Sequence, residues 1–307
     1  MRLIITIPAF NEEKTLPEVI KSIPRKYVGV DSVKILVYSD GSTDRTVEVA
    51  KKAGADYVFV HKSNQGLAQT FRDILKESLK LGADYIVNTD ADNQYEQKEI
   101  GLLLAPLLKD EADMVIGDRQ VGKLQHMPLS KKYGNMLGSF VIRFLTGTHV
   151  SDASSGFRAF TAELAKKIFI SSDHTYTHEM IIAAHFKNFR MKDVPVTFYK
   201  RTTGGSRLIS GVLSHIVKSG SIILRTLLLY RALSFFTSIG GTFVGLGFVG
   251  VFRFLYFALI EGKAGGHIQS LVISSILVGV GFNIIVVGFL ADLLSYNRKL
   301  IEERLGK

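Results

Sequence analysis

Two aspartates and a glutamine follow an apolar segment, and their side chains suit a divalent cation. Asp90, Asp92 and Gln94 come directly after Tyr85–Val87, whose composition is typical of a buried β-strand. Because side chains alternate faces in extended backbone, carboxylates two positions apart would point the same way. Mg²⁺ and Mn²⁺ prefer such oxygen ligands and usually keep positions for water and substrate phosphates. The spacing therefore predicts a metal site formed by Asp90, Asp92 and Gln94, with a solvated acidic loop as the alternative.

Alternating strands and helices predict how these carboxylates are positioned. Strands are expected at Leu3–Ile7, Lys34–Tyr38, Tyr57–His61, Tyr85–Thr89 and Met114–Gly117, and helices at Thr15–Ser22, 44–52, Gly66–Leu81 and Gln97–Leu108. This alternation is typical of an α/β domain with a mainly parallel, doubly wound sheet. Ligands of such sheets bind at the carboxyl ends of the strands. Since Asn11, Asp40 and Asp90 each follow a predicted strand, we expect one crevice to hold all three.

The composition excludes several classes of protein. The chain has 307 residues, no cysteine and a net charge of +10. The lack of cysteine excludes disulfides, thiolate metal sites and cysteine nucleophiles. G-x-x-x-x-G-K-[ST] does not occur, and G-x-G-x-x-G occurs only at Gly245–Gly250, inside an apolar run rather than between a strand and a helix, so a dinucleotide dehydrogenase and a P-loop phosphotransferase are unsupported. Met1–Ile7 is too short for a signal peptide and meets Pro8 at once, so we expect the N-terminal domain to stay in the cytoplasm.

Basic residues gather in two segments of the second half of the chain. An amphipathic helix is expected at Ser130–Leu145, with Lys131 and Lys132 in its first turn. A strand is expected at Val194–Tyr199, and the glycine-containing loop Lys200–Arg207 follows it with cations at both ends. Such a loop suits binding of a phosphate around which it can order, with a solvated basic loop as the alternative.

The last third of the chain predicts attachment to a membrane. Mean hydropathy is +0.20, high for a soluble enzyme, and the excess lies after residue 230. Leu208–Tyr230 has an apolar stripe with a basic flank, which is typical of a helix in the membrane interface. Ala232–Phe252 and Ile268–Ala291 are uncharged and long enough to span a bilayer, with a buried helical hairpin as the alternative. Basic residues lie before the first predicted span and after the second, whereas the loop between the spans is nearly neutral. Both termini are therefore expected in the cytoplasm.

These features together predict four regions and a chemistry. The regions are a catalytic domain at 1–207, interfacial helices at 208–231, two transmembrane helices at 232–294 and a cytoplasmic tail at 295–307.

A metal carboxylate pair suits a diphosphate, such as that of a nucleotide-sugar donor. An anionic, lipid-borne acceptor would suit the basic loop, and a phosphomonoester is largely dianionic at neutral pH because its second pKa is near 6. Such an acceptor needs cations to place it rather than a strong general base. The basic surplus then has a membrane explanation, and no nucleic-acid partner is expected.

Five segments carry a resemblance that covers essentially the whole chain. They are Pro8–Glu12, Ser39–Asp44, Asp90–Gln94, Asp152–Arg158 and Arg201–Ser206. They recur in this order in the family 2, GT-A-fold glycosyltransferases, and the chain resembles the polyprenyl-phosphate glycosyltransferases similar to dolichol-phosphate mannose synthase. Its two C-terminal spans look like the subgroup that transfers glucose or related sugars to dolichyl or undecaprenyl phosphate.

The resemblance implies an inverting transfer, dependent on Mg²⁺ or Mn²⁺, from a nucleotide-diphosphate sugar to a polyprenyl phosphate. UDP-sugars are favoured by the two-span subgroup, with GDP-mannose as the second candidate. The implied nucleoside contacts are Pro8, Phe10, Asn11, Glu12 and Asp40. The implied contacts to sugar, metal and diphosphate are Asp90, Asp92 and Gln94. The acceptor phosphate would contact Arg119 with Lys131 or Lys132, and the donor diphosphate would contact Arg201, Ser206 and Arg207.

The chain departs from the family pattern at three places. Ser39 stands where a first aspartate is frequent, Tyr95-Glu96 replaces the usual His/Asp-Pro, and a lysine replaces the usual acceptor-side arginine. Lysine is a point charge rather than a planar fork, so the last change weakens that assignment.

Several alternatives remain for individual residues and for the function. Arg158 is expected to pair with Asp152 rather than act in catalysis, and Glu179 either supports its helix or contacts the sugar. His174 and His178 are expected at the surface or behind the site rather than as metal ligands. The alternative functions are a processive polysaccharide synthase and a non-catalytic membrane scaffold that binds nucleotide or a partner. A homo-oligomer is a further hypothesis, because glycines in the first span permit close helix packing between chains or within one chain; they are Gly240, Gly241, Gly245, Gly247 and Gly250.

Overall fold

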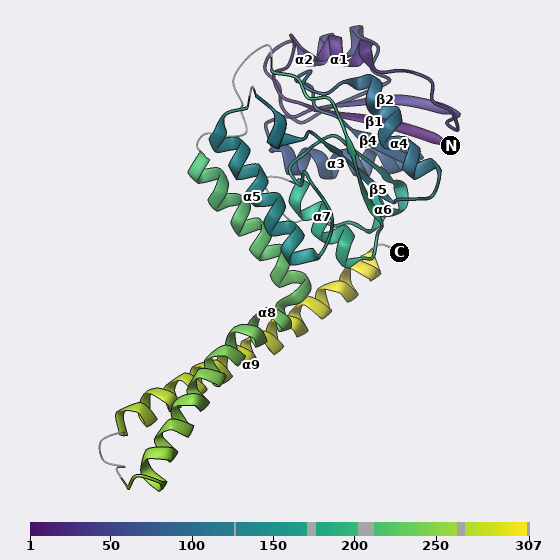
Figure 1. The fold of residues 1–307 in the computed structure, drawn as a ribbon. Helices are drawn as coiled ribbons and strands as arrows, with labels where there is room; N and C mark the ends of the chain where they lie inside the picture. The colour runs from purple at the N-terminus through teal and green to yellow at the C-terminus, as the bar shows by residue number, and fades with distance from the viewer. Residues whose placement is uncertain (126, 171–175, 202–211, 263–267, 306–307) are drawn as a thin grey trace. The chain divides into compact units, whose positions relative to one another are not determined.

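The computed structural model describes residues 1–125, 127–170, 176–201, 212–262 and 268–305. It divides into two compact units, Met1–Ile223 and Leu224–Lys307. The first unit contains a β-sheet with its covering helices, and the second contains the apolar parts of two long helices (Figure 1). The candidate residues Ser206 and Arg207, together with His174, lie outside the described residues.

The first unit is built on a seven-stranded, mainly parallel sheet. Its strands are β1 (Arg2–Ala9), β2 (Ser32–Ser39), β3 (Tyr57–Val60), β4 (Tyr85–Asn88), β5 (Met114–Asp118), β6 (Arg158–Thr161) and β7 (Met191–Pro195). They lie in the order β3-β2-β1-β4-β6-β5-β7. Only β6 runs antiparallel to its neighbours, β4 and β5. The expected mainly parallel sheet is therefore confirmed.

Helices cover both faces of this sheet. They are α1 (Leu16–Ser22), α2 (Thr46–Lys52), α3 (Leu67–Lys80), α4 (Ile100–Leu108), α5 (Leu129–Thr146), α6 (Ala162–Lys167) and α7 (Thr177–Phe186), with 3-10 turns η1 (Gln97–Glu99) and η2 (Val121–Lys123). Leu3, Ile5 and Ile7 of β1 share one core with apolar residues of α1, α2 and α4. Ile4 is fully buried on the other face, where α3 contacts β1 and β2. This two-residue alternation allows a strand that is buried on both sides to join two cores.

Two sequence expectations about strands were incomplete or wrong. β6 was not expected, because its four residues directly follow a polar turn and are too few for a periodic signal. The strand expected at Val194–Tyr199 is misplaced, since β7 ends at Pro195. Beyond Val196, whose N–H still donates to the Asp118 carbonyl at 2.9 Å, the backbone keeps only an isolated bridge between Phe198 and Tyr95. The segment after β7 therefore leaves the sheet and passes the acidic loop after β4.

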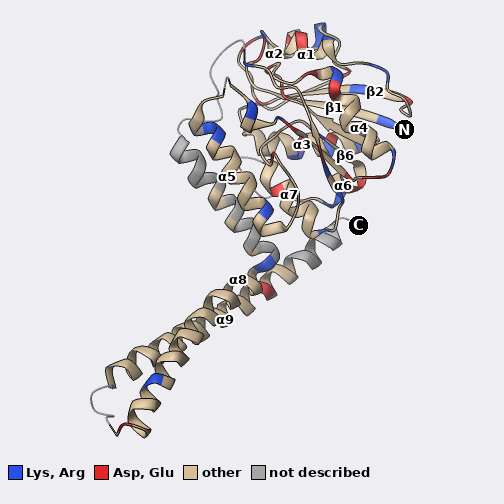
Figure 2. Ribbon diagram, in the orientation of Figure 1, with Lys and Arg blue, Asp and Glu red and all other residues tan. Residues whose placement is uncertain are grey.

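The second unit consists of parts of α8 (Val212–Leu259) and α9 (Ile268–Leu305). Arg231 interrupts α8 with non-helical dihedrals, φ −140° and ψ 37°. The segments Arg231–Leu259 and Ile268–Asn297 have mean hydropathies of 1.8 and 2.4, and only 6% and 17% of their most apolar windows are buried. They are long and apolar enough to cross a membrane, and they contain both predicted spans. Figure 2 shows how few charges the described part of this unit carries. Such exposure disfavours the core hairpin of a soluble protein. The interfacial helix expected at 208–231 stays a prediction, and residues 208–211 lie outside the described part.

Glycines let α8 and α9 approach closely within one chain. A Cβ atom on Gly240 would lie 2.5 Å from the carbonyl oxygen of Gly281, and one on Gly247 would lie 2.6 Å from a methyl group of Val278. Gly250 likewise faces Ser274. Small residues allow such backbone contacts between membrane helices. Three of the five glycines therefore pack the two helices of one chain, and the homo-oligomer remains a hypothesis.

Candidate active site

The carboxyl ends of three neighbouring parallel strands carry the candidate residues. β1 pairs with β2 on one side and with β4 on the other. The pairing continues past the strand ends, because Asp40 donates its N–H to Ala9 at 2.9 Å and Thr89 donates to Thr6 at 3.0 Å. Asn11, Asp40 and Asp90 thus follow strands that end at the same edge of the sheet, as expected. This edge is where open α/β sheets bind ligands.

Hydrogen bonds connect the loop after β1 to the loop after β2. The backbone N–H of Asn11 donates to Ser42 Oγ at 3.0 Å, and its side-chain Oδ1 accepts the Thr43 N–H at 2.8 Å. The next residue, Glu12, donates its N–H to Thr46 Oγ1 at 2.9 Å. Asn11 adopts φ +54°, a left-handed conformation that asparagine tolerates better than most residues. The residues Pro8 and Phe10, which are predicted to contact the nucleoside, lie just before these hydrogen-bonded loops.

The extended backbone of β4 does not continue through the aspartate pair, because Asp92 lies in a turn. β4 ends at Asn88, and Asp92 is followed by Asn93 at φ +58°. The expectation that strand alternation aligns the carboxylates is therefore wrong in its geometry, although the two charges do interact. Gln94 supports the turn, since its N–H donates to Asp92 Oδ1 at 3.3 Å and its Nε2 donates to the Tyr199 carbonyl at 3.0 Å. A cation ligand from Gln94 would consequently be its Oε1.

Arg201 links the acidic turn to the loop after β1. Its Nη2 donates to Glu12 Oε1, and its Nη1 lies 3.5 Å from Asp92 Oδ2. All three side chains are less than one-fifth exposed. Arg201 thereby supplies positive charge between Glu12, a predicted nucleoside contact, and Asp92, a predicted metal ligand.

The surroundings of Asp90 make a nearby cation favourable. Gly156 packs against this carboxyl, and a Cβ there would lie 2.9 Å from Asp90 Oδ1. Burial, followed by the charge of Asp92, raises the pKa of Asp90 from 3.8 to about 7. Burial also raises the pKa of Asp92, and Arg201 opposes that rise. The described residues contain no cluster of three or more His, Cys, Asp or Glu suited to a metal. Two buried carboxylates and an amide nevertheless fit a divalent cation that takes its other ligands from water and a diphosphate.

The raised pKa of Asp90 predicts pH-dependent metal affinity. A bound cation needs the ionised carboxylate, so Mn²⁺ affinity should rise about tenfold per unit below pH 7 and level off above it. The metal-free folded state keeps this proton up to about pH 7, whereas the unfolded chain loses it near pH 3.8. This group's contribution to stability is thus present below pH 3.8 and declines as the pH rises to 7. Calorimetric Mn²⁺ titrations between pH 5.5 and 8 test the first effect, and an affinity independent of pH would contradict it.

Arg119 and Asp152 form a second, buried charged group. Arg119 Nε and Nη2 donate to the two oxygens of Asp152 at 2.6 and 2.9 Å, and Nη2 also donates to Ser154 Oγ at 2.7 Å. The guanidinium lies over the Phe198 ring, 5.2 Å from its centroid. Although burial pushes the pKa of Asp152 up, Arg119 holds it below its ordinary value. Arg119 is therefore a rigidly oriented cation. Because Nε and Nη2 donate to Asp152, a contact to an acceptor phosphate would use the Nη1 side of the guanidinium group.

The expected pairing of Arg158 with Asp152 is wrong. Arg158 is fully buried and donates instead to the backbone carbonyls of Ala153, Ser155 and Thr177, at 2.7 to 2.8 Å. Asp152 lies opposite Arg119 because the turn between β5 and α5 and the turn before β6 meet at the same edge. Arg158 therefore holds the polar turn and the start of α7 together.

The remaining candidates lie on α5 and α7. Lys131 and Lys132 occupy the first turn of α5 and are partly exposed. Ser139, further along α5, accepts the Ala153 N–H at 3.0 Å and so ties this helix to the turn that holds Asp152. His178 and Glu179 are buried in the first turn of α7. For His178 this burial contradicts the expected surface position, and a place behind the site stays a prediction.

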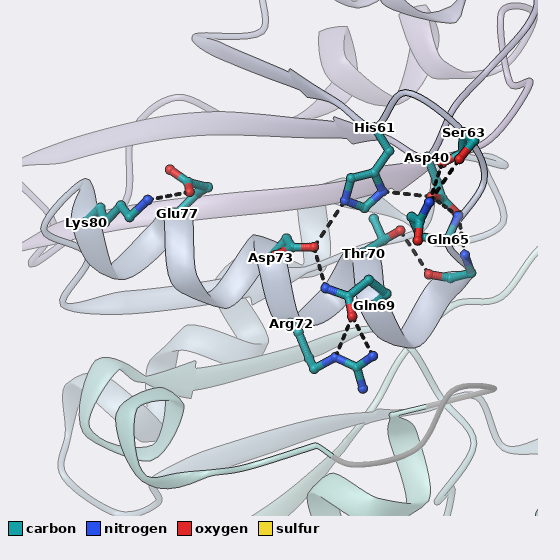
Figure 3. A network of polar contacts seen from close by, with 11 residues as sticks. Asp40, His61, Ser63, Gln65, Gln69, Thr70, Arg72, Asp73, Glu77 and Lys80 are labelled. Atoms are coloured by element: carbon teal, nitrogen blue, oxygen red, sulfur yellow. Dashed lines mark hydrogen bonds and ion pairs between the residues drawn. The ribbon is translucent and has the colours of Figure 1, made fainter. Parts of the chain in front are cut away.

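An acid–imidazole network beside the site was missed from the sequence. His61 contacts Asp40 and Asp73, and Figure 3 shows its ring between the two carboxylates. Sequence reasoning did not single out His61 or Asp73, because neither is part of a recognisable motif. Only the position of His61 at the end of a predicted strand could have drawn attention to it.

This arrangement defines an α/β enzyme domain with an acidic and cationic site at the carboxyl edge of its sheet. The family model of glycosyl transferase family 2 matches residues 4–169. Glycosyltransferase AglJ of Haloferax volcanii is 31% identical over 316 residues, which cover 97% of each chain. An undecaprenyl-phosphate mannosyltransferase of Micrococcus luteus is 28% identical, with coverage of 71% of this chain and 91% of the relative. The chain therefore belongs to glycosyl transferase family 2 and is a glycosyltransferase.

A solved structure supports the same fold. Glucosyl-3-phosphoglycerate synthase from Mycobacterium tuberculosis, in complex with Mn²⁺, UDP-glucose and phosphoglyceric acid, aligns with a TM-score of 0.57. The alignment covers 74% of this chain and 78% of that one at 21% identity. The expected GT-A class of fold is thereby confirmed.

Proposed function

We propose that this glycosyltransferase moves a hexose from a nucleotide-diphosphate sugar to a polyprenyl phosphate, with inversion at the sugar carbon. A UDP-sugar is the favoured donor, GDP-mannose is the second candidate, and the acceptor is dolichyl or undecaprenyl phosphate. The observation that carries the proposal is Arg201 between Glu12 and Asp92, where a donor diphosphate and its cation would meet. The relative from Micrococcus luteus, named for transfer to undecaprenyl phosphate, supports the acceptor class.

The donor would lie across the ends of β1, β2 and β4. Asp40 has about four acceptor positions, of which three are used by Gln65, Gly66 and His61, so one remains for an N–H of the base. Asp90, Asp92 and Gln94 would hold Mg²⁺ or Mn²⁺, which supplies positive charge to the departing diphosphate. Arg201 would exchange its contact with Asp92 for contacts with the donor phosphates, joined by Ser206 and Arg207.

The acceptor would approach from α5. One face of this helix exposes large apolar side chains; they are Leu129, Tyr133, Met136, Leu137, Phe140 and Phe144. Lys131 and Lys132 lie in the first turn of the same helix, and no ion pair holds either of them among the described residues. Apolar surface beside ammonium groups suits a phosphate carried on a lipid. These lysines and Arg119 would orient the acceptor.

Group transfer then needs little proton chemistry. A dianionic acceptor oxygen forms the new bond to the sugar carbon, the bond from that carbon to the diphosphate breaks, and its electron pair leaves with the nucleoside diphosphate. The cations of the chain would align the two phosphates for in-line displacement. The apolar segments of α8 and α9 would anchor the domain at the cytoplasmic face, with both termini inside, in accord with the basic flanks of the pair.

The test is sugar transfer by the purified full-length protein in detergent, with a polyprenyl phosphate and a panel of UDP- and GDP-sugars. Each donor is assayed with Mn²⁺ and with a chelator. A lipid-linked monosaccharide that forms from one donor only with metal is the expected result. A product longer than one sugar would favour a processive synthase instead. Metal-dependent nucleotide binding without transfer would overturn the acceptor, and the absence of both would favour a non-catalytic scaffold whose domain binds a partner instead of a nucleotide.

A further inference from the structure

His61 lies where it can control the candidate nucleotide-binding loop. It follows β3, and its N–H donates to the Ser39 carbonyl at 2.9 Å, which continues the pairing of β3 with β2. Its ring packs on Tyr38 of β2, with ring centroids 4.6 Å apart. The side chain is 13% exposed. Backbone pairing and ring packing therefore leave the imidazole one orientation.

Each ring nitrogen faces a different carboxylate. Nδ1 lies 2.8 Å from Asp40 Oδ1, and Nε2 lies 3.1 Å from Asp73 Oδ2 on α3 (Figure 3). Ionised carboxylates only accept hydrogen bonds, so a ring with both nitrogens protonated satisfies both contacts. The ring thus connects a residue at the strand ends to a residue on the helix behind them.

Asp40 uses its remaining contacts to hold the loop between β3 and α3. Its Oδ1 accepts the Gln65 N–H at 2.8 Å, and its Oδ2 accepts the Gly66 N–H at 2.9 Å. Gly66 directly precedes α3 and has φ +87°. The Asp40 side chain is only 7% exposed, so few orientations are open to it. A rotation of the Asp40 side chain would displace this loop. It would also redirect the one acceptor position of the Asp40 carboxylate that is left for the donor.

Asp73 is itself held in place. Gln69, one turn earlier on α3, donates its Nε2 to Asp73 Oδ2 at 2.7 Å, and the Gln69 oxygen accepts from Nε and Nη2 of Arg72. Arg72 Nη1 donates to the Ile170 carbonyl at 3.1 Å. The network is therefore anchored outside the loop that it orients.

We infer that His61 is a positioning residue for donor binding: it orients the Asp40 carboxylate and, through it, the 62–66 loop against the nucleoside of the donor. The inference rests on the proposed function and adds a residue that contacts no substrate. It gives Asp73 a role as the support that keeps His61 turned toward Asp40.

Two isosteric variants test the inference on the full-length protein. His61→Asn keeps an N–H near the Nδ1 position and so keeps the contact to Asp40, whereas His61→Gln keeps one near Nε2 and so keeps only the contact to Asp73. We expect His61→Gln to raise the donor KM and the Kd for UDP with Mn²⁺ roughly tenfold, because a hydrogen bond to a charged group is lost. Its kcat should stay within about twofold. His61→Asn should keep KM and Kd within about threefold of wild type.

The outcomes separate this inference from the proposed function. The positioning role would be overturned if both variants had the same donor KM, either unchanged or raised together with a lowered melting temperature. Sugar transfer by the wild-type protein would still uphold the proposed function in that case. Wild-type protein that binds neither UDP nor GDP with Mn²⁺ would overturn the proposed function and the inference with it. Asp73→Asn should shift KM in the same direction as His61→Gln, and an unchanged KM would remove Asp73 from the network.

Discussion

Replacement of Asp92 by asparagine should reduce sugar transfer about a thousandfold or more, which corresponds to roughly 4 kcal/mol of lost transition-state stabilisation. The side chain keeps its size but loses the charge that would hold the cation at the donor diphosphate. The loss should appear mainly in kcat and should persist at high Mn²⁺ concentration. Transfer rates and calorimetric Mn²⁺ titrations measure both effects. Near-normal turnover would refute the assignment of this site.

Arg201→Ala provides the informative comparison. Arg201 lies 3.5 Å from Asp92 and supplies positive charge to the carboxylate pair in the metal-free state. Its removal should therefore weaken donor binding but leave Mn²⁺ affinity equal or higher, opposite in sign to the effect of Asp92→Asn. Asp31→Asn serves as the matched control for Asp92→Asn, because the Asp31 side chain is 87% exposed and pairs with the N-terminal amine. That variant should match wild type in both measurements.

Replacement of Arg158 by methionine should destabilise the first unit by about 3–5 kcal/mol. Methionine fills much of the volume, but the carbonyls of Ala153, Ser155 and Thr177 would each lose the hydrogen bond from the fully buried guanidinium. The loss of hydrogen bonds to buried carbonyls is costly because no water replaces the donor. Thermal unfolding of the detergent-solubilised protein should show a midpoint lowered by about 10 °C or more.

The matched control is Arg45→Met, at an arginine that is 75% exposed and pairs with Glu13. Exposed ion pairs contribute about 0–1 kcal/mol, so its midpoint should change little. Equal midpoints for the two variants would contradict the role assigned to Arg158. A direct catalytic role for Arg158 would instead appear as lost activity without lost stability.

Local sequence patterns determined much of the first unit. The apolar runs of β1, β2 and β4 are long enough, and the repeat of α3 regular enough, for the local pattern alone to predict each element. Because parallel strands end at one edge, the order of these elements also placed Asn11, Asp40 and Asp90 together. The uncharged stretches in α8 and α9 are equally local signals, since their length and composition alone match the thickness of a bilayer.

Tertiary structure decided which charged groups face one another. Arg201 reaches Glu12 across 189 residues of chain, and Asp152 takes Arg119 as its partner although Arg158 is closer in sequence. Such pairings depend on how turns from separate strands meet, which no local pattern encodes. The raised pKa of Asp90 likewise follows from burial against Gly156 and the charge of Asp92. Residue types and their order show which side chains could do the chemistry, but their partners depend on the fold, because hydrogen bonds and charges act over a few ångströms of space rather than along the chain.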